Sequence, residues 1–263
     1  MKLEKWRYAQ ASVIGLAHLN QETECQDRVT CQTLATKNGE ILIAAVADGA
    51  GSTSHGQIGA EIACQLFVTE IKSFLRSSGE SVKSISEDFG KYWVNYFQKK
   101  LEETAQKDEK ELREYASTFI GAIVGENIAV FFQIGDGAAV YSVSGAAESY
   151  HFAIAPLESE YVNMTEFLTD KTAIEQFRYA LIEENIEDLI LFSDGIYAVA
   201  VNYQTNQPHE PFLMPMIAPL RNTNAPNGLN EKLEKFLSSP KINEKTDDDK
   251  TIILASRSSY KKQ

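Results

Sequence analysis

Aspartates recur in this sequence directly beside short apolar or alternating runs, at five places: Asp27, Asp48, Asp136, Asp194 and the cluster 247–249. Asp48, for example, follows the uninterrupted apolar run 41–47, and Asp194 follows the run DLILFS. Short, bounded apolar runs are typical of buried strands. Strands that end at a common edge would bring these carboxyl groups to one point.

Carboxylates gathered in a poorly solvated site repel one another, so their coexistence calls for bound cations. An all-oxygen set with no interleaved His or Cys favours hard ions such as Mg²⁺ or Mn²⁺ over Zn²⁺. Gly49, directly after Asp48, would let a ligand approach the backbone oxygen closely. The alternative is that the Asp-Gly pair only makes a strand-to-helix turn, which is common turn chemistry.

Composition narrows the classes of protein that the chain can be. Its 263 residues, of which 43% are hydrophobic, can bury a sizeable core, and no linker is apparent, so we expect a single domain over 1–263. A net charge of −12 argues against a nucleic-acid partner. The apolar runs are too short for a membrane span and no signal peptide is recognisable, so the sequence predicts a cytoplasmic protein.

Hydrophobic periodicity gives the elements that must position the aspartates. Strands are predicted at 8–17, 29–35, 41–47, 118–124, 128–134, 138–143, 148–154, 174–182, 188–192 and 250–255. Helices are predicted at 57–75, 84–106, 194–200 and, after a Pro-rich loop, 227–237. The four strands between 118 and 154 are expected to form a meander. Strands in hairpins around two consecutive helices favour an antiparallel α/β sandwich over a wound parallel sheet.

Six short motifs occur along the chain in this order: CQDR, VADGAGSTSHGQIGAEIA, STFIGAIV, FFQIGDGAAVY, LILFSDGI and DDDKTIILA. Together they resemble the metal-dependent Ser/Thr protein phosphatases of the PP2C type, particularly a bacterial branch, over nearly the whole chain. The resemblance implies an α+β fold in which two antiparallel sheets form a sandwich with helices on both faces. The polar segment 156–170 looks like the flap of that branch.

The resemblance also implies the chemistry, which is hydrolysis of phosphoserine and phosphothreonine by water that bridges two divalent ions, Mn²⁺ or Mg²⁺. Asp48 would bridge the ions, and the Gly49 carbonyl would be a further ligand. Asp194 and Asp248 match the ligands of the first metal. With Asp48 they are the predicted catalytic residues. The expected partner is a protein phosphorylated by a Ser/Thr kinase.

Asp27 matches the acidic pair on the second-metal side, and Asp136 matches a third, looser metal position. The family usually has Glu-Asp where this chain has Gln26-Asp27, so a neutral amide replaces one carboxylate. The family's phosphate-binding arginine has no counterpart between residues 19 and 25. His18 and Arg28 are the nearest substitutes, although His18 also fits a hydrogen-bonded histidine at a strand end.

Three alternatives remain open on the sequence alone. His55, in the loop after Asp48, either supplies a proton to the leaving oxygen or is a surface residue. An aspartyl-phosphate hydrolase of the HAD type also carries its nucleophile at a strand end, but it needs a second acid two positions on, where this chain has Ala50. The replaced carboxylate and the missing arginine are compatible with a phosphatase-like binding or regulatory module.

Overall fold

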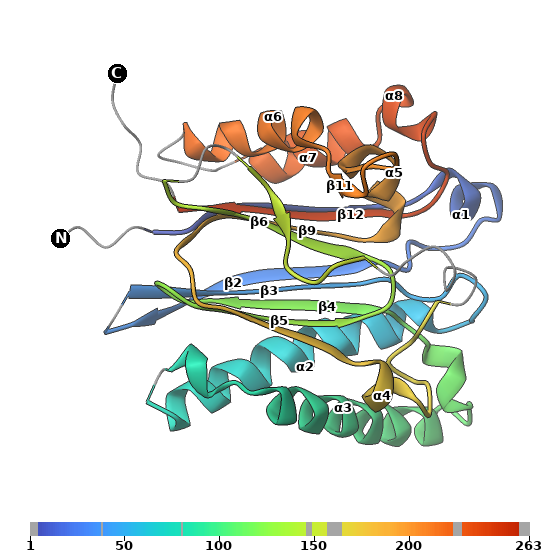
Figure 1. Cartoon of the computed structure of the whole chain (residues 1–263). Coiled ribbons are helices and arrows are strands. Elements are labelled where there is room, and N and C mark those ends of the chain that lie inside the picture. The colour runs from blue at the N-terminus through green and yellow to red at the C-terminus, as the bar shows by residue number, and fades with distance from the viewer. Residues whose placement is uncertain are drawn as a thin grey trace.

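The protein is described here from a computed structural model, covering residues 5–37, 39–79, 81–145, 149–156, 165–222 and 228–257. Two five-stranded antiparallel sheets face each other and carry helices on their outer faces (Figure 1). The first sheet contains, in spatial order, β1 (Arg7–Val13), β12 (Lys250–Ser256), β9 (Ile186–Phe192), β6 (Ala138–Val143) and β7 (His151–Phe152). The second contains β2 (Arg28–Thr36), β3 (Gly39–Ala47), β4 (Phe119–Val124), β5 (Ala129–Ile134) and β8 (Arg178–Ile182). The predicted fold class is confirmed.

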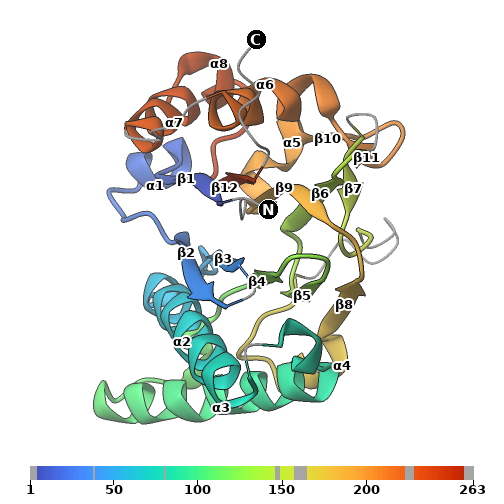
Figure 2. The same cartoon turned by 90° about the vertical axis from the view of Figure 1, so that its left-hand side faces the viewer.

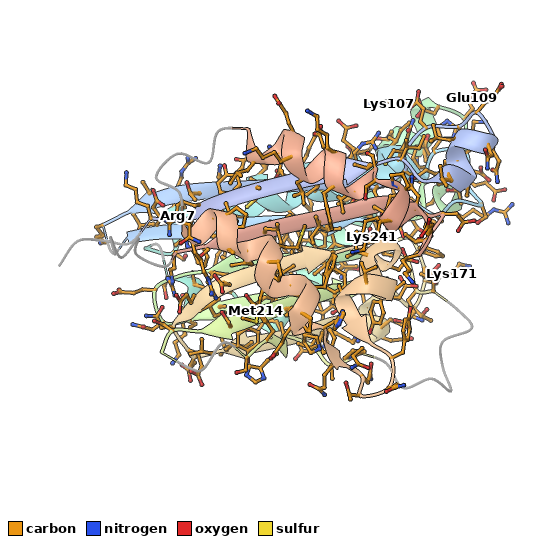
Figure 3. The ribbon with its side chains drawn as sticks, turned by 90° about the horizontal axis from the view of Figure 1, so that it is seen from above. Arg7, Lys107, Glu109, Lys171, Met214 and Lys241 are labelled. Atoms are coloured by element: carbon orange, nitrogen blue, oxygen red, sulfur yellow. The ribbon has the colours of Figure 1, made fainter. Side chains whose placement is uncertain are left out.

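The helices form the two outer layers, as the end-on view in Figure 2 shows. The second sheet is covered by α2 (Gly56–Ser77) and α3 (Glu87–Lys107), and the first by α6 (Glu210–Arg221) and α7 (Leu229–Leu237). Figure 3 looks down on the latter layer, with Met214 of α6 labelled. No helix among the described residues is both long and apolar enough to cross a bilayer.

The shorter elements connect these layers. They are α1 (Leu16–Asn20), α4 (Ala173–Gln176), α5 (Tyr197–Ala200), α8 (Pro240–Asn243), the small hairpin β10 (Val201–Asn202) and β11 (Gln207–Pro208), and the 3₁₀ turns η1 (Val82–Ser84), η2 (Leu112–Tyr115) and η4 (Asp194–Ile196).

Strand β3 shows why an uninterrupted apolar run was needed. Its odd-numbered residues, such as Ile43, pack against α2 and α3, and its even-numbered residues, such as Leu42 and Val46, pack against the first sheet. Side chains alternate across a strand, so a strand covered on both faces has no position for an exposed polar group. By the same alternation, the residue after Ala47 continues the side that faces the first sheet.

Helix α3 begins after Ser86, whose hydroxyl accepts a hydrogen bond from the Phe89 backbone N–H. The aromatic residues at helical spacing in this segment are core residues at Trp93 and Phe97, which are buried against α2 and β4. The helical layer therefore packs large apolar side chains against the outer face of the second sheet.

The expected meander between 118 and 154 is wrong. β4 and β5 pair within the second sheet, whereas β6 and β7 pair within the first, so the chain crosses between the sheets at 135–137. Gly135 makes this crossing with a φ of +97°, and a Cβ on it would lie 2.6 Å from Thr118. The residue at the centre of the crossing is Asp136.

Three other strand predictions need correction. The strand expected over 8–17 ends at Val13, because Gly15 and α1 follow. The strand expected over 174–182 is α4 followed by β8, since only 178–182 pair with β5. Of 148–154, only β7 forms, and residue 148 lies outside the described residues.

The Pro-rich loop expected before the last helix is also wrong, because Glu210–Arg221 form α6. Pro211 lies in the first turn, where a backbone N–H has no intrahelical partner anyway. Pro215 and Pro219 follow at four-residue intervals, so all three rings lie on one exposed side. The opposite side buries Leu213 and Ile217, and this burial compensates for the backbone hydrogen bonds that the interior prolines remove.

Candidate metal centre

The aspartates converge at the end of the sandwich that carries α1, on the right in Figure 1. Asp48 continues the side of β3 that faces the first sheet. Arg28 pairs with Ala47, so Asp27 lies beside Asp48 at the same edge. From the opposite sheet, the Ser193 hydroxyl donates to Asp27 Oδ2 at 2.7 Å. At this end of the sandwich the two sheets therefore contact each other through polar groups. These groups lie a few residues beyond the apolar core.

Asp48 is the central member of the cluster. Its carboxyl group lies within hydrogen-bonding range of the Asp27 carboxyl on one side and of the Asp194 carboxyl on the other. Its backbone is fixed by Thr118, which donates its N–H to Asp48 O at 2.8 Å and accepts the Asp48 N–H on its hydroxyl at 3.1 Å. Acids from both sheets are thus brought to one point.

Burial and mutual repulsion dominate the electrostatics of these acids. Burial raises the pKa of Asp27 to about 6. Burial and the neighbouring Asp136, Asp248 and Asp27 raise the pKa of Asp194 to about 7. Burial, with Asp27 and Asp194 close by, raises the pKa of Asp48 well above its usual value. The raised pKa values mean that ionised carboxylates are unfavourable in this site. A bound cation would stabilise their ionised form.

The residues fit hard divalent ions. Asp27 Oδ1 and Asp194 Oδ1 are buried and have no hydrogen-bond partner among the described residues, so each has a lone pair available for a cation. Across the same described part, no three His, Cys, Asp or Glu side chains are arranged to hold one ion unaided. Mg²⁺ and Mn²⁺ suit such a set because they are bound by one or two carboxylates, completed by carbonyl oxygens and water. The Gly49 carbonyl, next to Asp48, is such an oxygen, and it keeps one lone pair after accepting a hydrogen bond from the Gln26 amide.

Asp248 is held through its backbone. A Cβ on Gly15 would lie 2.3 Å from the Asp248 carbonyl carbon, and a Cβ on Gly195 would lie 1.9 Å from the Asp249 carbonyl oxygen, so only glycine allows both approaches. The fully buried Lys250 donates from Nζ to Asp248 O at 3.1 Å. These contacts fix the start of β12 against η4, which begins at Asp194.

Asp136 lies at the edge of the cluster. It is exposed, and its Oδ2 accepts a hydrogen bond from the Thr165 hydroxyl at 3.0 Å. Its charge contributes to the raised pKa of Asp194. Of the segment expected to be a flap, residues 157–164 lie outside the described residues, and Thr165 brings its far end to Asp136.

Comparison with known proteins identifies the family. The model of the family described as protein phosphatase 2C matches residues 14–238. The chain belongs to the protein phosphatase 2C family. This phosphatase is 32% identical over 254 residues to Serine/threonine-protein phosphatase 3 of Escherichia coli (strain K12), covering 95% of this chain and 98% of that protein. The predicted enzyme class, a PP2C-type Ser/Thr protein phosphatase, is confirmed.

Solved structures agree in fold. The serine/threonine phosphatase of S. agalactiae is 16% identical and superposes with a TM-score of 0.61, covering 96% of this phosphatase and 99% of that chain. The catalytic domain of the serine/threonine protein phosphatase PstP, solved in complex with two manganese ions, is 14% identical with a TM-score of 0.61, covering 97% and 99%. At these identities the likeness shows the fold alone.

The two predicted phosphate-binding residues of this phosphatase have different surroundings. His18 is buried in α1, and its Nδ1 lies 2.9 Å from Asp249 Oδ1. Arg28 instead donates from Nη1 to the carbonyl oxygens of Cys25 and Asp27, each at 2.8 Å. The Arg28 guanidinium therefore supports the backbone beside Asp27.

His55 lies at the start of α2. Its Nδ1 is 2.6 Å from the Ser54 hydroxyl, and its ring lies 5.1 Å from that of Tyr115. Its backbone N–H donates to Glu114 O at 3.0 Å. These contacts hold His55 against η2, and none of the interactions described for its ring involves a carboxyl group of the cluster.

Gln26 faces the backbone of the loop after Asp48. With its amide oriented to satisfy both acceptors, it donates to Ala50 O at 2.9 Å and to Gly49 O at 3.1 Å. A Cβ on Gly56 would lie 2.6 Å from the same atom of the Gln26 amide, which is the nitrogen in this orientation, so the amide fits closely between this loop and α2. A carboxylate could not donate to either carbonyl, and this explains why an amide suits this position of the chain.

Three residues that organise the site were not predicted from the sequence: Ser193, Thr118 and Asp249. Asp249 accepts backbone hydrogen bonds from Gly15 and Gln26 and contacts His18. The alternation rule does separate Asp249 from Asp248 at the start of β12. The rule does not determine which groups lie on either side of the strand, so only Asp248 was predicted as a ligand.

The three acids of the terminal cluster should differ in their importance. Asp247→Ala should leave the Mn²⁺ concentration for half-maximal activity unchanged, because that side chain is exposed. Asp248→Ala should raise it about 100-fold or more, since even loss of a group that only orients a metal ligand costs about 10- to 100-fold. Titrating Mn²⁺ against the rate for both variants measures this. Equal effects would mean that Asp248 is an ordinary acid in a solvated loop.

Proposed function

We propose that this phosphatase, a single domain over residues 1–263, hydrolyses phosphoserine and phosphothreonine in proteins with two Mn²⁺ or Mg²⁺ ions at the cluster around Asp48. The position of the Asp48 carboxyl between the Asp27 and Asp194 carboxyls carries this proposal, because it joins acids from both sheets. The divalent-metal dependence of the family and the two manganese ions of the PstP catalytic domain support the same metal class.

Each acid has a role in this proposal. Asp48 would be a ligand of both ions, with the Gly49 carbonyl beside it. Asp194 and Asp248 would hold the first ion, and Asp27 the second. When bound, such a pair of ions lowers the pKa of water and stabilises negative charge on phosphate oxygens. The chain's part is to fix these oxygens, as Ser193 does by its hydrogen bond to Asp27.

Asp136 is proposed to hold a third, more weakly bound ion. Its exposure and its hydrogen bond to Thr165 support weaker binding, because an ion there competes with both water and the hydroxyl. Half-occupancy of this position would therefore need a higher metal concentration than half-occupancy of the two inner positions.

In this proposal His18 is the residue that contacts the phosphate group of the substrate. The Arg28 guanidinium already contacts four groups: the carbonyls of Cys25 and Asp27 at Nη1, Gln57 at Nη2 and Glu61 at Nε. His18 lies against Asp249 through Nδ1, which leaves its Nε2 for another group. The substrate would be a protein phosphorylated by a Ser/Thr kinase, because hydrolysis of a phosphoserine or phosphothreonine ester reverses that modification.

A second candidate function is phosphoprotein binding with weakened turnover. The Gln26 amide favours it, because its hydrogen bond to Gly49 O occupies one lone pair of a carbonyl that we assign to the metals. That carbonyl has a second lone pair, and the central aspartates are all present, so active hydrolysis remains the proposed function.

Phosphate release from matched peptides tests the proposal. The Mn²⁺-loaded protein should release inorganic phosphate from phosphoserine and phosphothreonine peptides and much less from the matched phosphotyrosine peptide. Tight binding of the phosphothreonine peptide without release would favour the binding function. Equal turnover of all three peptides would overturn the proposed substrate class.

A further inference from the structure

Asp249 is a buried carboxylate at the centre of a contact network, although no role in metal binding is assigned to it. Only 2% of its surface is exposed. Its Oδ1 accepts the Gly15 backbone N–H at 2.7 Å, and its Oδ2 accepts the Gln26 backbone N–H at 2.6 Å. Oδ1 also lies 2.9 Å from His18 Nδ1. One side chain therefore connects β12, α1 and the chain segment that carries Asp27.

A buried carboxylate destabilises the fold unless its partners compensate for the lost hydration. Burying an ionised group is unfavourable, and only good hydrogen bonds and a nearby opposite charge make it tolerable. Gly15 and Gln26 supply backbone donors that any acceptor could satisfy. His18 is the one partner that differs, because its ring is the only titratable side chain within ion-pair distance of the Asp249 carboxylate among the described residues.

The contact with Asp249 determines which ring nitrogen of His18 can contact a further group. Nδ1 lies 2.9 Å from Asp249 Oδ1, so Nε2 is the ring nitrogen left to face another group. Nε2 lies next to the loop that follows Asp48, since a Cβ built on Gly51 would be 3.4 Å from it. The ring is thus held between the start of β12 and the loop of the central aspartate. Rotation of the ring about its side-chain bonds would break its contact with Asp249 or its contact with the loop at Gly51.

We propose that Asp249 is a positioning residue that directs His18 Nε2 towards the phosphoryl group of the substrate, and this inference rests on the proposed function. A nitrogen held in place costs less ordering entropy when substrate binds than one on a mobile side chain. The same carboxylate fixes the Gln26 peptide beside Asp27. Phosphate contact and the metal-binding carboxylates are therefore aligned by one group.

A purely structural role for Asp249 makes a different prediction. In that case Asp249 would only anchor α1 to β12, and its loss would lower stability without acting through the His18 ring. The two roles are distinguished by a double-mutant cycle, because residues that act through each other are not additive. Asp249→Asn preserves size and removes the charge, His18→Ala removes the ring, and Asp247→Asn is the matched control at the exposed neighbouring acid.

Two measurements that need no turnover are made on these variants. Nitrogen-15 NMR of the metal-free protein reports which ring nitrogen of His18 carries the proton. Calorimetry with inorganic phosphate on the Mg²⁺-loaded protein reports phosphate binding. In wild type and Asp247→Asn, we expect a neutral His18 to be protonated at Nδ1 and phosphate to bind equally well.

We expect Asp249→Asn and His18→Ala each to weaken phosphate binding about 10- to 100-fold, and the double variant to be no weaker than His18→Ala alone. Additive losses, a neutral His18 protonated at Nε2 in wild type, or wild-type phosphate affinity in His18→Ala would each overturn the inference. The phosphate affinity of His18→Ala can be measured even if Asp249→Asn does not fold. If wild type released no phosphate from peptides but showed this coupling, the proposed function would fail while the positioning role stood.

Discussion

Removal of divalent metal is expected to abolish peptide dephosphorylation, and Mn²⁺ or Mg²⁺ is expected to restore it. The proposed ligands are carboxylate and carbonyl oxygens, and no Ser, Cys or His nucleophile is assigned to the reaction. The ions would lower the pKa of the attacking water and stabilise charge on phosphate, so their loss removes most of the catalysis. The measurement is phosphate release from a phosphothreonine peptide after dialysis against EDTA and graded addition of each metal.

Zinc is the informative comparison in that titration. Zn²⁺ prefers nitrogen and sulfur ligands in a tetrahedral site, whereas the cluster around Asp48 offers oxygen only, so we expect much weaker restoration by Zn²⁺. Full turnover in excess EDTA would show that the reaction needs no exchangeable metal. A clear preference for Zn²⁺ would show that the ligand set is wrong.

Asp48→Asn should lower kcat/KM by about 1,000-fold or more. A bridging carboxylate contacts both ions, and loss of about 4 kcal/mol of transition-state stabilisation corresponds to roughly that factor. The amide is nearly the same size, and the Thr118 hydrogen bonds involve only the Asp48 backbone, so the fold should survive. Kinetics of the Mn²⁺-loaded variant, with circular dichroism as the control for folding, test this expectation.

The same substitution should raise the Tm of the metal-free protein. The carboxyl of Asp48 has a raised pKa because of burial and the nearby Asp27 and Asp194, so its ionised form destabilises the fold. A group whose pKa is higher in the folded chain stabilises the fold below its unfolded pKa, and this contribution is lost as pH rises through the folded pKa.

The metal-free wild type should therefore lose stability as pH rises from about 4, the ordinary carboxyl pKa, through the values of about 6 for Asp27 and about 7 for Asp194. Asp48→Asn should show a smaller fall over this range, and its advantage in Tm should be small at pH 4 and large at pH 8. Near-normal turnover, or a lower Tm at pH 8, would place the centre of the cluster elsewhere.

The sequence alone was sufficient for the fold class, and it singled out acids that the structure brings together. An apolar run with no polar interruption requires cover on both faces, and β3 has it. The helical spacing of Trp93 and Phe97 required a buried face. The pattern of aspartates at strand ends also located Asp27, Asp48 and Asp194, because a strand end determines where its next side chain lies.

The tertiary structure decided how these parts combine. Periodicity did not distinguish a meander from strands divided between two sheets, because both have the same short turns. The prolines of α6 indicated a loop, and only burial of the opposite face makes that helix favourable. The partners of Asp249 lie up to 234 residues away along the chain, as Gly15 and Gln26 do. Local sequence patterns reach only a few residues, so contacts between distant segments come from the packing of the two sheets.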